Sequence, residues 1–188
     1  GSVRLNGKEI HCKSPHEAIE LGIALISENR KEEGILPNFD NKDNISLASM
    51  KKYMSGIVIN DDKKKRNALE KGKQVGLKPN DPAFMTVSLS GGNAQKVILA
   101  RWMSTDATVM IFDEPTKGID IGAKADIYLL MEKMAAEGIA IIMVSSELIE
   151  VMGMSDRILV MSDGKITGEL MKDEFSEESI LNYTVEEN

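Results

Sequence analysis

A run of four apolar residues that ends in two adjacent acids is the strongest constraint on the fold of this chain. The run is Val109–Phe112, the acids are Asp113 and Glu114, and Pro115 follows them. Because the run does not alternate with polar residues, it is typical of a strand buried on both faces, as strands of parallel sheets are. The two acids therefore lie at the carboxyl end of a strand, where open α/β sheets bind their ligands.

The second half of the chain alternates between strand and helix patterns, which favours a parallel sheet with flanking helices. The expected order is strand 108–112, helix 122–137, strand 139–144, helix 146–152 and strand 157–161. Asp163-Gly164 then predicts a tight turn into a further strand at 165–170. A last helix is expected at about 175–183.

The first half carries turn and cap signals. Asn6-Gly7 predicts a hairpin over residues 3–12, and Ser14-Pro15-His16-Glu17 predicts a capped helix that ends near Gly22. The elements expected next are a strand at 23–27, a polar loop at 28–41, a helix at 44–53 and a helix at 61–75 that Asp61 caps. We expect three regions: 3–42, a helical subdomain at 43–104, and an α/β core at 105–188.

Ser88–Asn93 reads Ser-Leu-Ser-Gly-Gly-Asn and opens a helix that is expected to run to about Ser104. Ser90 is placed as the cap of that helix, and its hydroxyl can accept from a backbone N–H or reach a phosphate. Gly91 and Gly92 lack Cβ atoms, so their amides can approach an anion, which the helix dipole also favours. The alternative is a capped helix start that follows a flexible turn.

The acids after the buried strand also suit phosphate chemistry. One carboxylate there can hold Mg²⁺, usually through water. A second can orient and deprotonate a water molecule that attacks a phosphoryl group. The alternative is two solvated acids in a loop.

Composition excludes several classes. Hydrophobic residues make up 42% of the 188 residues and charged residues 28%, as in ordinary soluble domains. The net charge of −7 argues against nucleic acid as a partner. The single Cys12 cannot form an internal disulfide, which favours a reducing compartment. The apolar run at 139–144 has the length of a core strand, well below the roughly 20 residues that cross a bilayer.

Three segments together resemble the ATP-binding subunits of ABC transporters. They are residues 88–101, 109–122 and 143–161, which are similar to the signature motif, the Walker B motif with its D-loop, and the switch region. The motif sequences are similar to those in the second ATP-binding half of monosaccharide importers of the ribose, galactose and xylose type. These motifs are Leu-Ser-Gly-Gly-Asn-x-Gln-Lys-Val, Asp-Glu-Pro-Thr-Lys-Gly-Ile-Asp-Ile-Gly-Ala-Lys and Val-Ser-Ser-Glu-Leu. The resemblance implies a P-loop NTPase core with a mainly parallel sheet and a helical subdomain. It also implies ATP and Mg²⁺ as cofactors.

The resemblance assigns a role to each matching residue. Asp113 serves Mg²⁺, Glu114 is the catalytic base, and Asp120 is the D-loop acid that communicates across a pair of ATP-binding halves. The residues that bind the γ-phosphate of ATP held by the opposite half are Ser90, Gly91, Gly92 and Asn93.

Two positions depart from the usual family pattern. Glu28 falls where many members have the Q-loop glutamine, and a carboxylate there is anionic where the amide is neutral. Ser146 falls where most members have the switch histidine, and serine cannot supply its titratable ring. These changes suggest an asymmetric pair, in which the intact Ser90 signature assists the site of the sibling half.

The chain has no Gly-x-x-x-x-Gly-Lys-Ser/Thr loop to hold the ATP phosphates. In the family this loop precedes the hairpin that here begins at Val3, so the chain is expected to be an N-terminally truncated fragment. We expect the isolated chain to bind ATP poorly and to lack ATPase activity. We also expect it to self-associate through unpaired backbone and apolar surface.

The resemblance implies an ATPase subunit that energises monosaccharide import from the cytoplasmic face of the inner membrane. Its partners would be the other nucleotide-binding half, integral membrane permease subunits and, indirectly, a sugar-binding protein. The alternatives are a nucleoside importer and a non-catalytic half that supplies only its signature motif. Residues 28–41 either lie near the groove for the membrane subunit or form an ordinary surface loop. Lys63–Arg66 is either a solvated helix face or a contact with anionic lipid.

Overall fold

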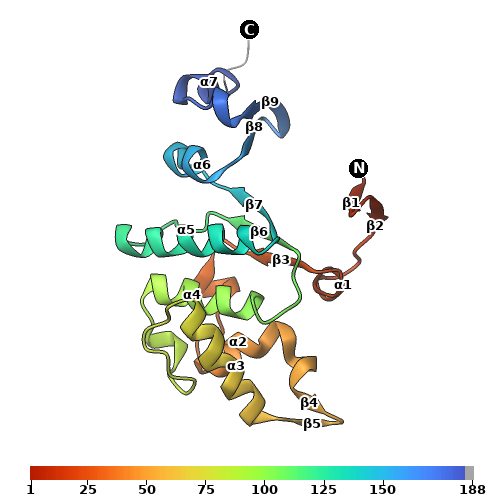
Figure 1. Cartoon of the computed structure of the whole chain (residues 1–188), viewed down its shortest axis with the longest axis vertical. Helices are drawn as coiled ribbons and strands as arrows, with labels where there is room; N and C mark the ends of the chain where they lie inside the picture. The colour runs from red at the N-terminus through yellow and green to blue at the C-terminus, as the bar shows by residue number, and fades with distance from the viewer. Residues whose placement is uncertain (185–188) are drawn as a thin grey trace. The chain divides into compact units, whose positions relative to one another are not determined.

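A parallel sheet forms the centre of the first of two units in the computed structural model (Figure 1). The structure describes residues 1–184; the first unit is Gly1–Ile142 and the second begins at Met143. Strand β3 (Ile23–Ile26) pairs in parallel with β6 (Val109–Asp113), and β7 (Ala140–Val144) follows β6 in the order β3-β6-β7. The register places Ile26 opposite Phe112, so both strands end at the same edge.

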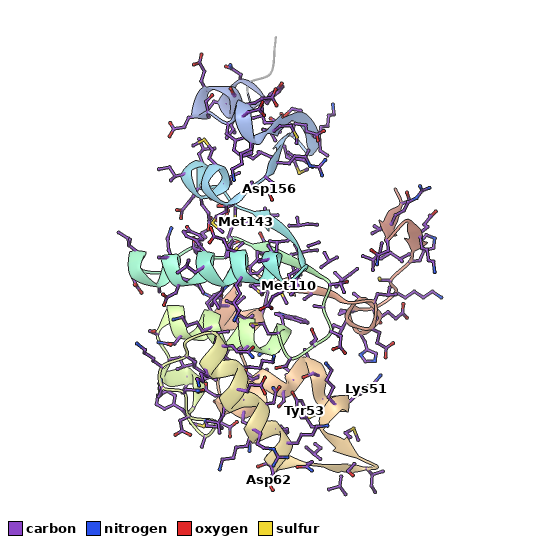
Figure 2. The ribbon with its side chains drawn as sticks, viewed as in Figure 1. Lys51, Tyr53, Asp62, Met110, Met143 and Asp156 are labelled. Carbon is purple, nitrogen blue, oxygen red and sulfur yellow. The ribbon has the colours of Figure 1, made fainter. Side chains whose placement is uncertain are left out.

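The two faces of this sheet differ in burial. Met110 (labelled in Figure 2), Phe112 and Ile26 are buried on one face. On the other face Leu25 and Ile142 are each 52% exposed. The apolar run in β6 predicted burial on both faces, but its alternate residues are only half-buried because the described chain leaves that face partly uncovered.

Two long helices are placed by side-chain caps. Helix α4 (Gly91–Trp102) begins after Ser90, whose Oγ accepts from the Asn93 N–H, as predicted. Helix α5 (Ile121–Ala136) begins after Asp120, whose carboxylate accepts from the Ala123 N–H at 3.0 Å. The buried residues of α5 recur at helical spacing, so they form the stripe that faces the core: Ile127, Leu130, Met131 and Met134.

The helical region between β3 and α4 differs in detail from the prediction of one helix at 44–53. Helix α2 (Asn41–Ser46) starts earlier, because the Asp40 carboxylate caps it through the Asp43 N–H at 2.8 Å. The 3₁₀ segment η2 (Leu47–Tyr53) follows, with a kink at Ser49, and ends at the buried Tyr53 (Figure 2). Serine hydroxyls bonded to preceding carbonyls, such as Ser46 Oγ to Lys42 O at 2.7 Å, favour such bends.

A short hairpin and a third helix complete this region. Strands β4 (Met54–Ser55) and β5 (Val58–Ile59) pair through a turn in which Gly56 has a φ of +63°, and the sequence patterns did not predict this hairpin. Helix α3 (Asp61–Gln74) is capped by Asn60, one residue before the predicted Asp61. Helices α2, α3 and α4 pack against one another (Figure 1).

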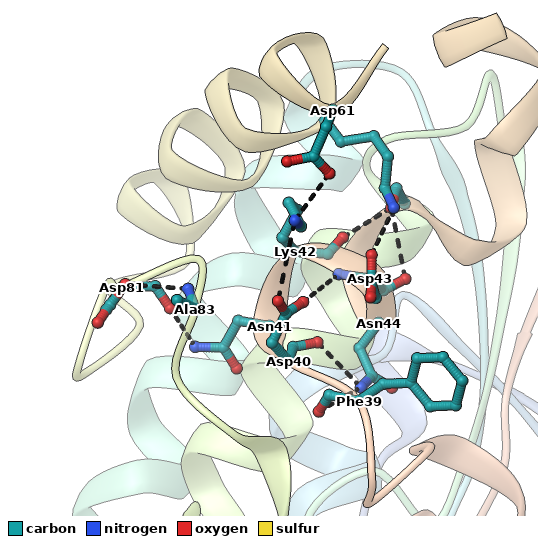
Figure 3. A network of polar contacts seen from close by, with 11 residues as sticks. Phe39, Asp40, Asn41, Lys42, Asp43, Asn44, Asp61, Asp81 and Ala83 are labelled. Atoms are coloured by element: carbon teal, nitrogen blue, oxygen red, sulfur yellow. Dashed lines mark hydrogen bonds and ion pairs between the residues drawn. The ribbon is translucent and has the colours of Figure 1, made fainter. Parts of the chain in front are cut away.

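A buried polar network ties the start of α2 to the segment after β3. Arg101 of α4 donates from Nη1 to Gly34 O at 2.7 Å and from Nε to Asn44 O at 2.7 Å. The Asn44 amide donates in turn to backbone carbonyls of residues 36–40, and its neighbours are drawn in Figure 3. Burial lowers the pKa of Arg101 to about 10. The network fixes the residues from 34 to 44 on the body of the unit.

The remaining elements of the first unit lie near its start. Strands β1 (Val3–Leu5) and β2 (Lys8–Ile10) form the predicted hairpin, with positive φ at Asn6 and Gly7. Helix α1 (Pro15–Glu20) has the predicted Ser14 cap. One wide helical turn, η1 (Arg30–Gly34), occurs inside the expected loop, and the short 3₁₀ turn η3 (Thr86–Ser88) precedes the Ser90 turn.

The second unit has its own small core. Strand β8 (Arg157–Ser162) pairs antiparallel with β9 (Lys165–Met171) through the predicted Asp163-Gly164 turn. Its other elements are α6 (Leu148–Met154), η4 (Lys172–Glu174) and α7 (Glu177–Asn182). The core residues are Ile158, Val160, Leu170 and Ile180. No helix in the described residues 1–184 of the chain is both long and apolar enough to cross a membrane.

Candidate functional site

The two predicted carboxylates lie at the carboxyl end of β6. Asp113 is the last residue of the strand, and both Asp113 and Glu114 are half-buried. Glu114 has a φ of +47°, a left-handed conformation that is uncommon outside glycine and clusters at functional sites. Buried residues 115 and 116 follow it. Glu114 therefore lies in a strained backbone turn at the carboxyl edge of the sheet, the edge at which open α/β sheets bind ligands.

The turn after Glu114 is closed by its own backbone. The Lys117 N–H donates to Glu114 O at 3.2 Å, and the Ile119 N–H donates to Thr116 O at 3.2 Å. Gly118 between them has a φ of +66°. Asp120 then ends the turn and caps α5. The segment from Asp113 to Asp120 is thus a compact loop that joins the strand end to the next helix.

Glu28 lies at the same edge of the sheet. Because Ile26 is opposite Phe112, Glu28 and Glu114 each follow that pair by two residues. Glu28 Oε1 lies 2.6 Å from Lys117 Nζ, with the two side chains 39% and 60% exposed. The Glu28 hydrogen bond and charge raise the pKa of Lys117, and the charges of Glu114 and Asp113 add to the rise.

Arg30 makes a second contact to the same loop. Its Nη2 donates to Lys117 O at 2.6 Å. The guanidinium is half-buried, and burial lowers the pKa of Arg30. A Cβ on Gly118 would lie 3.5 Å from Arg30 Nη2, so the arginine packs against this turn as well as bonding to it.

The Ser90 turn lies beside this loop. A Cβ on Gly91 would lie 3.6 Å from Gly118 O. Ser90 Oγ also accepts from Asn93 Nδ2 at 3.1 Å, and Asn93 Oδ1 accepts from the Lys78 N–H at 2.8 Å. Ser90 and Gly91 remain exposed, so the first turn of this twelve-residue helix is open to a ligand.

An open groove of about 560 Å³ runs from the Ser90 turn along α5. Ser90, Asn93 and Asp120 all line it. Four lysines also line the groove: Lys73, Lys78, Lys96 and Lys133. Of these, the buried Lys96 is paired, with Nζ 2.6 Å from Asp126 Oδ2. The groove therefore brings the expected phosphate-binding turn together with four lysines and two aspartates, Asp120 and Asp126.

The predicted site residues thus form two groups in the first unit and one in the second. Ser90, Gly92, Asn93 and Asp120 line the groove, and Glu28, Asp113 and Glu114 share the sheet edge. Ser146 follows β7 and belongs to the second unit. Its neighbour Ser145 donates from Oγ to the buried Glu150 carboxylate. Nothing in this geometry assigns a function to Ser146.

The sequence patterns did not single out Lys117 or Arg30. Lys117 is part of the Asp-Glu-Pro-Thr-Lys-Gly string, but its partner Glu28 is 89 residues away. Local patterns carry no signal for such a contact, because it depends on the register between β3 and β6.

The donor set fits magnesium together with a phosphate ligand. In residues 1–184 no group of three or more His, Cys, Asp or Glu side chains is arranged to hold a metal by itself. Mg²⁺ is usually held by one or two carboxylates together with water and phosphate oxygens, and not by an all-protein cage. Asp113 and Glu114 at the strand end suit that arrangement.

Comparison with known sequences gives the relatives of this chain. The family profile described as ABC transporter matches residues 1–117. The chain is 48% identical to a putative ribose/galactose/methyl galactoside import ATP-binding protein of Rhizobium etli, over 96% of the chain and 34% of that protein. It is 47% identical to an arabinose import ATP-binding protein of Pseudomonas syringae pv. syringae, over 98% of the chain and 37% of that protein. It is 43% identical to a ribose import ATP-binding protein of Halalkalibacterium halodurans, over 97% of the chain and 37% of that protein. The chain thus spans little more than a third of each relative.

Comparison with solved structures gives the fold. A dimeric ATP-binding cassette in a post-hydrolysis state, bound to ADP and Pi, superposes with a TM-score of 0.76 at 21% identity, over 93% of this chain and 75% of that one. An ATP-binding cassette of an ABC transporter in its ADP conformation gives a TM-score of 0.76 at 21% identity, over 94% of this chain and 73% of that one. At this identity the likeness concerns the fold alone, and it confirms the predicted α/β NTPase core with its parallel sheet and helices.

Proposed function

This chain belongs to the ABC transporter family, and on that premise we propose that it is part of an ATP-binding and ATP-hydrolysing subunit that energises monosaccharide import. The observation that carries the proposal is the pair Asp113–Glu114 at the carboxyl end of β6, with Glu114 held at a positive φ in the loop whose Gly118 lies against Gly91 of the Ser90 turn. The names of relatives at 43–48% identity, which are import proteins for sugars, support the substrate class.

In the proposed nucleotide site, each of a few residues has a separate role. Asp113 serves Mg²⁺, which supplies positive charge to the phosphate oxygens when it is bound. Glu114 orients and deprotonates the attacking water. The turn at Ser90, Gly91, Gly92 and Asn93, of which Ser90 and Gly91 are exposed, directs its amides and hydroxyl at the γ-phosphate of ATP held by the other half. Asp120, in the same groove, communicates between the two halves.

The partners follow from this proposal. The chain pairs with a second nucleotide-binding half, because its signature turn acts on ATP bound elsewhere. The subunit acts on integral membrane permease subunits, and through them it depends on a sugar-binding protein. It associates peripherally with the cytoplasmic face of the cell membrane.

A second candidate function rests on two residues. Ser146 lacks a titratable ring, and Glu28 puts a carboxylate in place of a neutral amide. Both changes favour a half that hydrolyses little ATP itself and supplies its Ser90 turn to the site of its partner.

The substitution Glu114→Gln in the full-length gene product separates the two candidates. We expect steady-state ATP turnover to fall by about 10²-fold or more if Glu114 is a general base. Unchanged turnover, together with loss of turnover in Ser90→Ala, supports the second candidate. If the wild-type protein neither binds nor hydrolyses ATP, both candidates are wrong.

A further inference from the structure

Lys117 places its ammonium group next to an acidic residue of the candidate site. Its Nζ lies 2.6 Å from Glu28 Oε1. The carboxylates of Glu114 and Asp113 also act on it, since their charges contribute to the raised pKa of Lys117. This cation thus pairs with Glu28 and is near enough to Glu114 and Asp113 to feel their charge, at the edge where two neighbouring parallel strands end.

The backbone of Lys117 is fixed as well as its side chain. Its N–H donates to Glu114 O at 3.2 Å, and its carbonyl accepts from Arg30 Nη2 at 2.6 Å. Glu28 and Arg30 both belong to the segment that follows β3. Lys117 is therefore joined to that segment at two points, once through its side chain and once through its main chain.

We infer that Lys117 is a positioning residue of the proposed nucleotide site: it neutralises Glu28 and ties the segment after β3 to the loop after β6. The inference rests on the function proposed above. It explains how a carboxylate is tolerated at position 28, where a neutral amide would need no counter-charge.

The physical reason is electrostatic. A triphosphate is strongly anionic, and an unpaired carboxylate at the same sheet edge repels it. When the carboxylate is paired with an ammonium group at hydrogen-bond distance, the pair as a whole has little net charge. The two side chains are partly open to water, so the repulsion is screened and the effect on nucleotide affinity is moderate.

Nucleotide affinity tests this role without reference to turnover. We would titrate the full-length gene product with a fluorescent ATP analogue in the presence of Mg²⁺. Lys117→Gln leaves Glu28 unpaired, and we expect about two- to fivefold weaker binding, the range for a pair half open to water. Glu28→Gln in the same protein removes the repelling charge, so Glu28→Gln/Lys117→Gln should bind as the wild type does. Lys65→Gln, at an exposed lysine of α3, is the matched control and should leave affinity unchanged.

The double substitution decides between two roles for Lys117. If Lys117→Gln weakens binding equally with Glu or Gln at position 28, Lys117 contacts the nucleotide directly and the inference is wrong. If Lys117→Gln behaves like Lys65→Gln, the pair has no role in binding and the inference is also wrong. If the wild type does not bind the analogue at all, the proposed function fails and the inference fails with it.

Charge reversal tests the pair in the absence of nucleotide. Glu28→Lys and Lys117→Glu each place like charges together, so each should lower the thermal midpoint more than Lys65→Glu does. The combination Glu28→Lys/Lys117→Glu should recover most of the loss, because the ion pair re-forms with its charges exchanged. Additive losses would overturn the inference, since no pair would then join the two segments.

Discussion

Gly92 at the start of α4 lies against Ala123 at the start of α5, so closely that a Cβ on Gly92 would be 2.7 Å from the Ala123 Cβ. Such a contact is too short for two carbon atoms, and it makes glycine at position 92 a packing requirement. The two helices that carry the Ser90 turn and the Asp120 cap therefore depend on this contact for their spacing.

We predict that Gly92→Ala destabilises the chain by about 1–3 kcal/mol, the usual cost of overpacking. Urea denaturation measures the effect. Gly91→Ala is the control, because a Cβ there would meet only Gly118 O at 3.6 Å, an ordinary contact. Gly92→Ala/Ala123→Gly should recover most of the lost stability. If the double variant recovers nothing, the contact between positions 92 and 123 is not the cause.

Arg101 gives the second prediction. Its guanidinium is buried and donates to two backbone carbonyls and to Asn44 Oδ1 at 3.0 Å. Arg101→Lys keeps a charge but cannot reach all three acceptors in the same plane. We expect a loss of about 2–3 kcal/mol in unfolding free energy, because buried carbonyls lose their donors.

A matched control for Arg101→Lys is Arg157→Lys in β8. Arg157 Nη1 lies 2.9 Å from Glu169 Oε1, and both side chains are more than half exposed. An exposed pair of this kind contributes about 0–1 kcal/mol, so this variant should unfold nearly as the wild type does. Equal effects of the two substitutions would contradict a structural role for the buried network.

The sequence predicts the parts of this site that depend on local chemistry. Ser90 caps its helix as expected, and Asp113 and Glu114 come at the end of a strand, because caps and strand ends are recognised from neighbouring residues. The cap that Asp120 provides for α5 was not predicted. The Asn60 cap was assigned to Asp61, since both residue types cap helices and adjacent positions compete. The Glu28–Lys117 pair was not predicted, because it needs the register of two strands far apart in the chain.

Lys42 and Asp61 give a prediction about pH. Lys42 Nζ lies 2.7 Å from Asp61 Oδ1 (Figure 3). The hydrogen bond from Lys42 holds the pKa of Asp61 below its ordinary value of 3.8. A depressed carboxyl pKa stabilises the fold above the unfolded value and is lost as the pH falls through the folded value. The stability difference between wild type and Asp61→Asn should therefore be present at neutral pH and shrink as the pH falls below 3.8.

Asp62→Asn is the control for this experiment. Asp62 is exposed in the same first turn of α3, so the two substitutions change the interaction with the helix dipole in a similar way. Chemical denaturation across pH 2–7 separates them. If Asp61→Asn and Asp62→Asn show the same pH dependence, the pair with Lys42 makes no separate contribution.

The partly uncovered face of the sheet gives the last prediction. Leu25 in β3 and Ile142 in β7 are each 52% exposed, on strands that flank β6. Apolar side chains on an open sheet favour association with another copy of the chain. We expect sedimentation velocity to show concentration-dependent association of this chain, and Leu25→Lys/Ile142→Lys to shift the population towards monomer. Leu181→Lys, at a residue of α7 that is 50% exposed in the second unit, is the matched control and should leave the association unchanged. A wild-type chain that stays monomeric at high concentration contradicts the prediction. If Leu181→Lys weakens association as much as Leu25→Lys/Ile142→Lys does, the open face of the sheet is not the contact surface.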